Sequence, residues 1–311
     1  MGNKEIYKKL CETEGSAIPL FLQYWWIETV CAGKEWDVVL AKAPDGRVAA
    51  AMPYLTGKRW GMRYVLQPQL TQYCGPWYRS KSAMGDASVQ FSSYFSHHGF
   101  LFFSQNFAPA LNDALHWGEY TYTERITYRI EDITDPQRVF EGFDKQRRQR
   151  PIRRAEKVLT VVEDVKPEEF ARFHAAYWAS RGQHDLLSQE FITHVVRTAL
   201  ARRQGMLLGV ADGEGKMHAA RFVVYDSNSA YSLLSALNPE GHHNGASALL
   251  FWRMIERLSS QTQAFDFEGS MDPSIAFSYS LYGARPVGYQ HVVYYRNRLV
   301  ERLFRTLKLN I

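Results

Sequence analysis

The clearest alternation of apolar and polar positions lies in the second half of the chain. Two runs rich in β-branched and aromatic residues, 217–225 and 230–237, flank the short polar segment 226–229, which predicts a β-hairpin. Apolar residues then recur at helical spacing over 249–258, and a short strand is expected at 264–268. The pattern therefore predicts a strand, a turn, a second strand, a helix and a further strand.

The loop at 238–247, between the second strand and the helix, contains two glycines and a proline. Small residues at a helix start leave backbone N–H groups unpaired at the positive end of the helix dipole, which favours an anion such as pyrophosphate. Gly245, Ala246 and Ser247 are the candidate donors. An ordinary connection to a helix capped by Asn244 or Ser247 explains the same residues equally well.

The first half of the chain shows a comparable order of elements. The pattern predicts helices at 16–31, 87–97 and 109–116, and strands at 36–42, 48–55, 64–67, 100–104 and 120–130. The long connection at 67–86 is rich in aromatic residues, which is typical of a substrate-facing loop or of a segment that covers a sheet.

An internal repeat links the two halves. Residues 39–54 resemble 208–225: both read as a strand, an Asp-Gly turn, a strand entered through alanines and a tyrosine. Helices are expected at 167–180 and 188–202, before the second copy, and duplicated α/β units follow from the repeat. Asp135-Pro136 signals a new helix, so we expect domains at 1–133 and 134–311.

Composition sets limits on the class of protein. Of 311 residues, 46% are hydrophobic, enough for two packed domains, and no run of about 18 apolar residues predicts a membrane span. The polar N-terminus does not resemble a secretory signal. Cys11, Cys31 and Cys74 lack the spacing of a disulfide framework or a zinc site, so we expect a cytoplasmic protein.

The net charge of +5 is concentrated in one segment. Residues 138–157 contain eight basic and three acidic side chains, and the remainder of the chain is neutral overall. Such a cluster attracts phosphate-rich partners such as tRNA or nucleotide-linked substrates, but a solvated helix face has the same composition.

Four segments together resemble a known family: the basic run 145–155, the loop 238–247, the strand 265–270 and the later segment 281–284. They resemble the GNAT acyltransferases, and more narrowly the tandem-GNAT group that contains the Fem-type peptidyltransferases. The resemblance implies an α/β fold with a mixed (α+β) sheet, built as two GNAT-like domains in tandem, the first degenerate. It also implies that acyl-coenzyme A lies between two central strands that splay apart.

In this family the pyrophosphate of coenzyme A lies on a short glycine loop. The corresponding pattern falls on His242, Gly245 and Ser247, so the resemblance implies a donor site made of His242, Asn244, Gly245, Ala246 and Ser247. We expect no metal, because the adjacent histidines have no evident third ligand.

Acyl transfer to an amine needs a base for the ammonium group, and Glu268 is the candidate. Side chains alternate along a strand, so Asp266 and Glu268 are expected on one face, with Asp266 structural. Alternatively, Glu268 pairs with Arg221, whose charge inside an apolar strand also needs a partner. Tyr282 stands near the position of a tyrosine that protonates the leaving thiolate in many GNAT enzymes.

These expectations combine into a cytoplasmic N-acyltransferase that uses acyl-CoA, with its small-molecule amine acceptor bound between the two domains. One alternative is Fem-type aminoacyl transfer from tRNA to a peptidoglycan precursor, with Arg147, Arg150 and Arg154 holding phosphates. The other alternative is a non-catalytic binding protein on the same scaffold.

Overall fold

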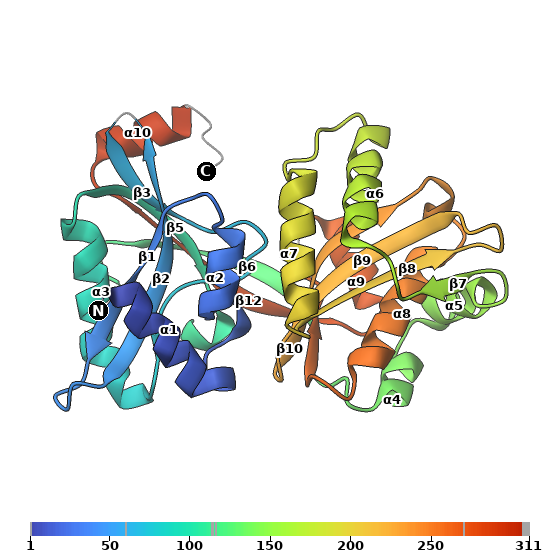
Figure 1. The fold of residues 1–311 in the computed structure, drawn as a ribbon, viewed down its shortest axis with the longest axis horizontal. Helices are drawn as coiled ribbons and strands as arrows, with labels where there is room; N and C mark the ends of the chain where they lie inside the picture. Colours follow the sequence, from blue (N-terminus) through green and yellow to red (C-terminus); the bar gives the residue numbers. More distant parts are fainter. Residues whose placement is uncertain (1, 60, 113–114, 116, 270, 307–311) are drawn as a thin grey trace. The chain divides into compact units, whose positions relative to one another are not determined.

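The chain divides into two compact units (Figure 1). The computed structural model describes residues 2–59, 61–112, 115, 117–269 and 271–306. Unit 1 comprises Met1–Arg125 and Gly288–Ile311, and unit 2 comprises Ile126–Val287. The sequence placed the boundary near Ile133 and all later residues in the second domain. The segment from Gly288 instead belongs to unit 1, because Gln290 to Tyr295 pair antiparallel with a strand of that unit.

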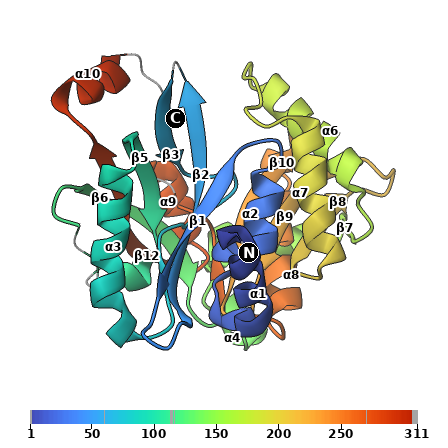
Figure 2. The same cartoon turned by 60° about the vertical axis from the view of Figure 1, so that its left-hand side comes forward.

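Unit 1 is built on a mixed sheet. Its strands are β1 (Trp36–Lys42), β2 (Val48–Arg59), β3 (Met62–Leu66), β4 (Trp77–Tyr78), β5 (Phe100–Phe107) and most of β12 (Arg285–Tyr295). They pair in the order β1-β2-β3-β5-β12, with β3 parallel to β5 and β4 added to β2. The helices are α1 (Asn3–Glu14), α2 (Tyr24–Val30), α3 (Met84–His97) and α10 (Arg298–Thr306). In Figure 2, α3 and α1 lie on opposite sides of these strands.

Two helices predicted in unit 1 differ from the structure. The expected helix at 16–31 is two short 3-10 turns followed by α2, because Pro19 interrupts the turn and Gln23 donates its side-chain amide to the carbonyls of Gly15 and Ile18. The expected helix at 109–116 is described only as a 3-10 turn, Pro109–Leu111, and residues 113–114 and 116 lie outside the described part.

Unit 2 also contains strands of mixed direction, with helices packed against them. Its strands are β6 (Thr121–Ile130), which enters the unit at Ile126, β7 (Thr160–Val162), β8 (Gly205–Ala211), β9 (Met217–Tyr225), β10 (Ser229–Leu237) and β11 (Ala264–Asp266). The order is β6-β11-β10-β9-β8-β7, and only β10 and β11 are parallel among the pairs of this sheet. The helices are α4 (Pro136–Glu141), α5 (Arg150–Ala155), α6 (Pro167–Ser180), α7 (Gln189–Ala201), α8 (Ala246–Leu258) and α9 (Pro273–Ser280).

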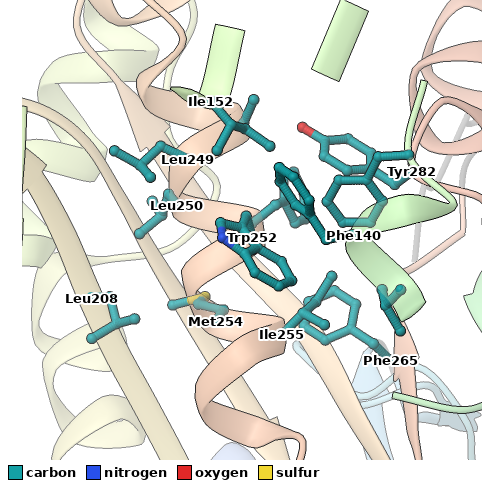
Figure 3. Close-up of a cluster of buried hydrophobic side chains, with 14 of the residues drawn as sticks. Phe140, Ile152, Leu208, Leu249, Leu250, Trp252, Met254, Ile255, Phe265 and Tyr282 are labelled. Atoms are coloured by element: carbon teal, nitrogen blue, oxygen red, sulfur yellow. The ribbon is translucent and has the colours of Figure 1, made fainter. Parts of the chain in front are cut away.

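Helix α8 anchors the core of unit 2. Its apolar side chains are buried against β8, β9 and α5, among them Leu249, Leu250 and Ile255 (Figure 3). Trp252 packs on Phe140 of α4, with ring centres 4.7 Å apart. Because the helix is held along its length, the position of its N-terminus is fixed.

Some classes of site and segment are absent from the described residues. None of the helices in this part of the chain combines the length and apolarity needed to cross a bilayer. Within the same ranges, no three His, Cys, Asp or Glu side chains gather closely enough to hold a metal ion.

Candidate functional site

Two neighbouring strands of unit 2 separate at the start of the site. Parallel strands β10 and β11 pair only over Ser229–Tyr231 and Ala264–Asp266. β11 ends there, whereas β10 continues to Leu237 with a register shift between Ser232 and Leu234. A strand that loses its partner in this way leaves room beside it, and the predicted loop follows directly.

The loop positions the N-terminus of α8. Gly245 has a φ of +83°, a conformation that glycine adopts without steric cost, and the side-chain Oδ1 of Asn244 accepts a 3.0 Å hydrogen bond from the Ala246 amide. Within the described ranges, the amides of Gly245, Ser247 and Ala248 have no acceptor. Unpaired amides at a helix start form a site for an anionic group.

A pocket of about 360 Å³ opens at this helix start. Its wall is formed by Arg147 and Arg148, by Gly241, His242, His243 and Gly245 of the loop, by residues in the first turns of α8 as far as Phe251, and by Tyr282. No aspartate or glutamate lines it. The pocket therefore joins two guanidinium groups to the positive end of a helix dipole, an arrangement that attracts phosphate.

The two pocket arginines come from a single π-helical turn, Lys145–Gln149, which leads into α5. Asp144 caps this turn by accepting from the amides of Gln146 and Arg147. Such π-turns occur frequently at functional sites, because the extra residue changes the direction of the side chains that follow.

Arg148 is half-buried and is held in place by its neighbours. Its Nη2 donates to the carbonyl and hydroxyl oxygens of Ser278 at 2.9 and 2.8 Å, and its guanidinium lies 4.4 Å from the centre of the Tyr282 ring. No carboxylate of the described chain pairs with Arg147 or Arg148. Both charges therefore remain available to a ligand.

A relay of polar side chains braces the loop from behind. Asp212 accepts from His218 Nε2 at 2.9 Å, and Asn244 Nδ2 donates to His218 Nδ1 at 3.1 Å. Asn244 in turn accepts from the first amide of α8, so the turn between β8 and β9 is connected to the helix start. The role of Asn244 in this structure is to shape the loop.

Gly245 is expected to tolerate no side chain. A Cβ there would lie 2.8 Å from the carbonyl oxygen of Pro151, whereas at Gly215, with a similar φ of +80°, nothing lies within 4 Å. Gly215→Ala should cost about 1–2 kcal/mol of unfolding free energy through backbone strain alone. Gly245→Ala should cost clearly more, because α5 must also move. Urea unfolding of both variants measures this difference, and equal losses would contradict the close contact.

Tyr282 is buried at the edge of the aromatic core (Figure 3). Its ring centre lies 5.1 Å from that of Phe251 and 5.2 Å from that of Phe143. Burial raises the pKa of Tyr282 to about 12, and the charges of Arg148 and Arg221 oppose that rise. The phenol is therefore protonated at neutral pH and can act as a proton donor at the pocket wall.

Glu268 follows β11 and does not lie on it. The strand was predicted to reach residue 268 but ends at Asp266, and Glu268 has a left-handed backbone with φ of +61°. The side chain is half-buried, and desolvation together with the neighbouring Asp266 carboxylate raises the pKa of Glu268 to about 8. A group with this pKa exchanges protons near neutral pH, and its ionised form can accept a proton as a general base.

Asp266 holds the end of β11 in place. Its Oδ1 accepts from Thr127 Oγ1 at 2.6 Å and from the Glu268 amide at 2.9 Å, and its side chain is fully buried. Asp266→Ala would remove the acceptor of both of these hydrogen bonds inside the fold, so we expect a loss of about 2–4 kcal/mol of unfolding free energy. Urea unfolding tests this, with Asp132→Ala, in an exposed turn, as the control that should lose far less. Equal stability of both variants would contradict the structural role.

The comparisons agree with this geometry. Residues 144–273 match the model of the GNAT acetyltransferase domain. The matched segment is therefore similar to this domain family. It contains the π-turn, both separating strands and the loop before α8. No curated protein matches the chain by sequence.

Solved structures share the fold over nearly the whole chain. The crystal structure of FemX has a TM-score of 0.68 at 12% identity, covering 98% of this chain and 97% of that one. The C-terminal domain of a putative lysylphosphatidylglycerol synthetase from Agrobacterium fabrum has 0.61 at 11%, covering 99% and 96%. A tandem GNAT protein from the clavulanic acid biosynthesis pathway has 0.53 at 12%, covering 94% of each chain. The predicted mixed α/β fold with two GNAT-like domains is thereby confirmed.

Unit 2 brings some of the predicted site residues together. His242, Gly245, Ser247, Arg147 and Tyr282 line one pocket. The other predicted residues do not line it: Asn244 and Ala246 form the cap beside it, Glu268 lies after β11, and Arg150 and Arg154 are exposed on α5. Ser270, the last residue of the motif that suggested the family, lies outside the described residues.

Sequence reasoning missed several residues of unit 2 at this pocket. Arg148, Ser278 and Ala248 line it, and none was singled out. Arg148 was one of several arginines in a basic run, and only the π-turn decides which of them point toward the loop. The unpaired amide of Ala248 follows from where α8 begins.

Proposed function

We propose that this protein transfers an acyl group from acyl-coenzyme A to an amine, and that the pocket at the N-terminus of α8 binds the phosphates of the donor. The observation that carries the proposal is that three unpaired amides and two arginines line the same pocket, and neither arginine has an acidic partner in the described chain. In a pocket with no acidic lining, these charges are compensated only by an anionic ligand.

The chemistry assigned to the site is a simple substitution. The amine nitrogen attacks the thioester carbonyl carbon, the C–N bond forms and the C–S bond breaks. Glu268 accepts the proton lost by the ammonium group, which its raised pKa favours. Tyr282 donates a proton to the leaving thiolate from the pocket wall, and the second proton that the nitrogen loses as the amide forms restores the phenol.

Thermal unfolding with millimolar acetyl-coenzyme A, coenzyme A and ATP tests the proposal. A ligand at about 100 times its dissociation constant stabilises the native protein by roughly 2.7 kcal/mol, which raises the midpoint by several degrees. We expect a larger shift with the two coenzyme A species than with ATP at equal concentration. No shift with either coenzyme A species would overturn the proposal.

The fold likeness to FemX supports a second candidate, transfer of an aminoacyl group from tRNA. The basic run continues past the pocket to the exposed Arg150, Arg153 and Arg154, which can contact further phosphates. This candidate predicts tRNA binding that weakens steeply between 50 and 200 mM salt, by roughly 10³-fold or more. Filter binding across that series distinguishes it from coenzyme A binding. If the protein bound neither tRNA nor coenzyme A, the remaining hypothesis would be a non-catalytic binding protein on the same scaffold.

A further inference from the structure

Arg221 is a charged residue in an apolar position. It lies on β9 between Ala219 and Val223, which belong to the core cluster under α8, and alternation along the strand places all three on one face. Only 6% of its surface is exposed. A structural role would require a carboxylate beside it, because a charge taken out of water is costly unless it is paired.

No such carboxylate is present in the described chain. Arg221 forms no ion pair within 4 Å there, so the alternative pairing with Glu268 is not formed. Its Nη1 donates to Ser232 Oγ at 2.6 Å, and its guanidinium lies 3.5 Å from the centre of the Phe251 ring. Stacking on a ring compensates only part of the lost hydration.

One edge of the guanidinium has no partner. Nε is buried without an acceptor, and no hydrogen bond from Nη2 is made to any described residue. Nε and Nη2 point from the same edge and match the spacing of two carboxylate oxygens. Burial lowers the pKa of Arg221 to about 10, so the group remains charged at neutral pH.

Arg221 contacts a side chain that lines the donor pocket. Phe251, on which Arg221 stacks, lines that pocket, and so does Tyr282, whose phenol interacts electrostatically with Arg221. Tyr279 and Tyr177 are the other side chains that act electrostatically on it, and neither is a carboxylate. The negative charge that would complete the site therefore has to come from a ligand.

We propose that the Nε–Nη2 edge of Arg221 binds a substrate carboxylate, so that either the acyl group or the amine acceptor is an acid. The identity of these substrates rests on the proposed function, whereas carboxylate recognition itself does not. A carboxylate fits better than an oxyanion formed during the reaction, because only a permanent charge balances the buried guanidinium in the resting complex.

The test compares wild type with Arg221→Met, Arg221→Lys and a control, Arg253→Met. Arg253 lies on α8 but is paired with Glu156 at 2.9 Å and Glu256 at 2.6 Å. Arg221→Met removes an unpaired buried charge, so its unfolding midpoint should not fall below that of wild type. A markedly lower midpoint with unchanged ligand binding would mean that Arg221 is only structural, and would overturn the proposal.

Binding is measured by calorimetry with free acids and their amides, without coenzyme A: succinate against succinamide, and glutamate against glutamine. Wild type and Arg253→Met should bind at least one acid roughly tenfold or more tightly than its amide. Arg221→Met should lose this preference and Arg221→Lys should retain only part of it, because lysine cannot bind side-on. The proposal would be overturned if wild type bound no acid more tightly than its amide, which is expected if only water occupies the Nε–Nη2 edge. It would also be overturned if Arg221→Met kept the same preference for the acid.

A second pair of probes assigns the carboxylate to donor or acceptor. If wild type prefers succinyl-coenzyme A over butyryl-coenzyme A and Arg221→Met abolishes this preference, the carboxylate belongs to the acyl group. If wild type prefers an amino acid over its decarboxylated amine and the same variant loses this preference, the carboxylate belongs to the amine acceptor. Failure of every coenzyme A species to bind would count against the proposed function alone, because the free-acid measurement is independent of it.

Discussion

Replacing Glu268 by glutamine lowers the rate of acyl transfer about 100- to 10,000-fold, the usual contribution of a positioned general base. Glutamine has the same shape but cannot accept a proton, so the donor should bind as it does to wild type. Release of the coenzyme A thiol in the presence of an accepted amine measures the rate, and calorimetry measures donor binding. Glu240→Gln, on the surface, is the control and should retain full activity.

The pH dependence of this reaction follows from the pKa of Glu268. Only the ionised form can act as a base, so the wild-type rate should rise with pH and level off above about 8. In the Gln variant the residual rate should lack this step. A variant that keeps the full rate, or the same pH profile, would remove Glu268 from the mechanism.

The ionisation of Glu268 also makes the stability of the folded protein depend on pH in a predictable direction. Its pKa is raised in the folded protein from 4.5 to about 8, so the native state retains a proton that the unfolded chain loses. Its contribution to stability therefore falls as pH rises from about 4.5 and levels off above about 8. Glu268→Gln lacks this loss, so its unfolding midpoint relative to wild type should increase across that window.

Replacing both Arg147 and Arg148 by methionine weakens donor binding roughly 100-fold or more. Each arginine offers a charge-assisted hydrogen bond to phosphate, worth about 1.5–3 kcal/mol, and the apolar stems remain to pack. Calorimetric titration with coenzyme A measures the loss. Because both charges line the pocket without an acidic partner, the dependence of affinity on salt should also decrease.

The matched control is the pair Arg150→Met and Arg154→Met. It removes the same number of charges from the same basic segment, but both side chains are exposed and neither lines the pocket. Donor affinity should change little. Equal losses in the two double variants would mean that the segment acts only through its overall charge, and that the pocket has no special role.

Much of the second half of the fold was predictable because its local signals agree. Helix α6 and strand β9 have the predicted limits, Pro167–Ser180 and Met217–Tyr225, and α7, Gln189–Ala201, lies one residue inside its predicted limits of 188–202 at each end. In each case the apolar period and the residue at the boundary favour the same structure. The hairpin before the site and the loop position followed from the same signals.

The features of the fold and the site that could not be predicted from the sequence depend on contacts between residues far apart in the chain. The return of 288–311 to unit 1 rests on pairing of β12 with β5, and no local pattern reports such a pairing. α1 was missed because its exposed face is highly charged and only Tyr7 and Leu10 are buried. Likewise, Arg148 enters the pocket through a π-turn that no periodicity predicts, and the open edge of Arg221 depends on the ring of Phe251 beneath it.

The next measurement is the amide spectrum of the ¹⁵N-labelled, deuterated protein during titration with coenzyme A. If the helix start binds the donor's phosphates, the unpaired amide protons of Gly245, Ser247 and Ala248 should shift downfield together, as they gain acceptors. Amides at the start of α7, where Ser188 already caps the helix, should not move. Binding of coenzyme A that leaves the three amides unchanged, or that shifts another helix start instead, would contradict the assignment of this pocket.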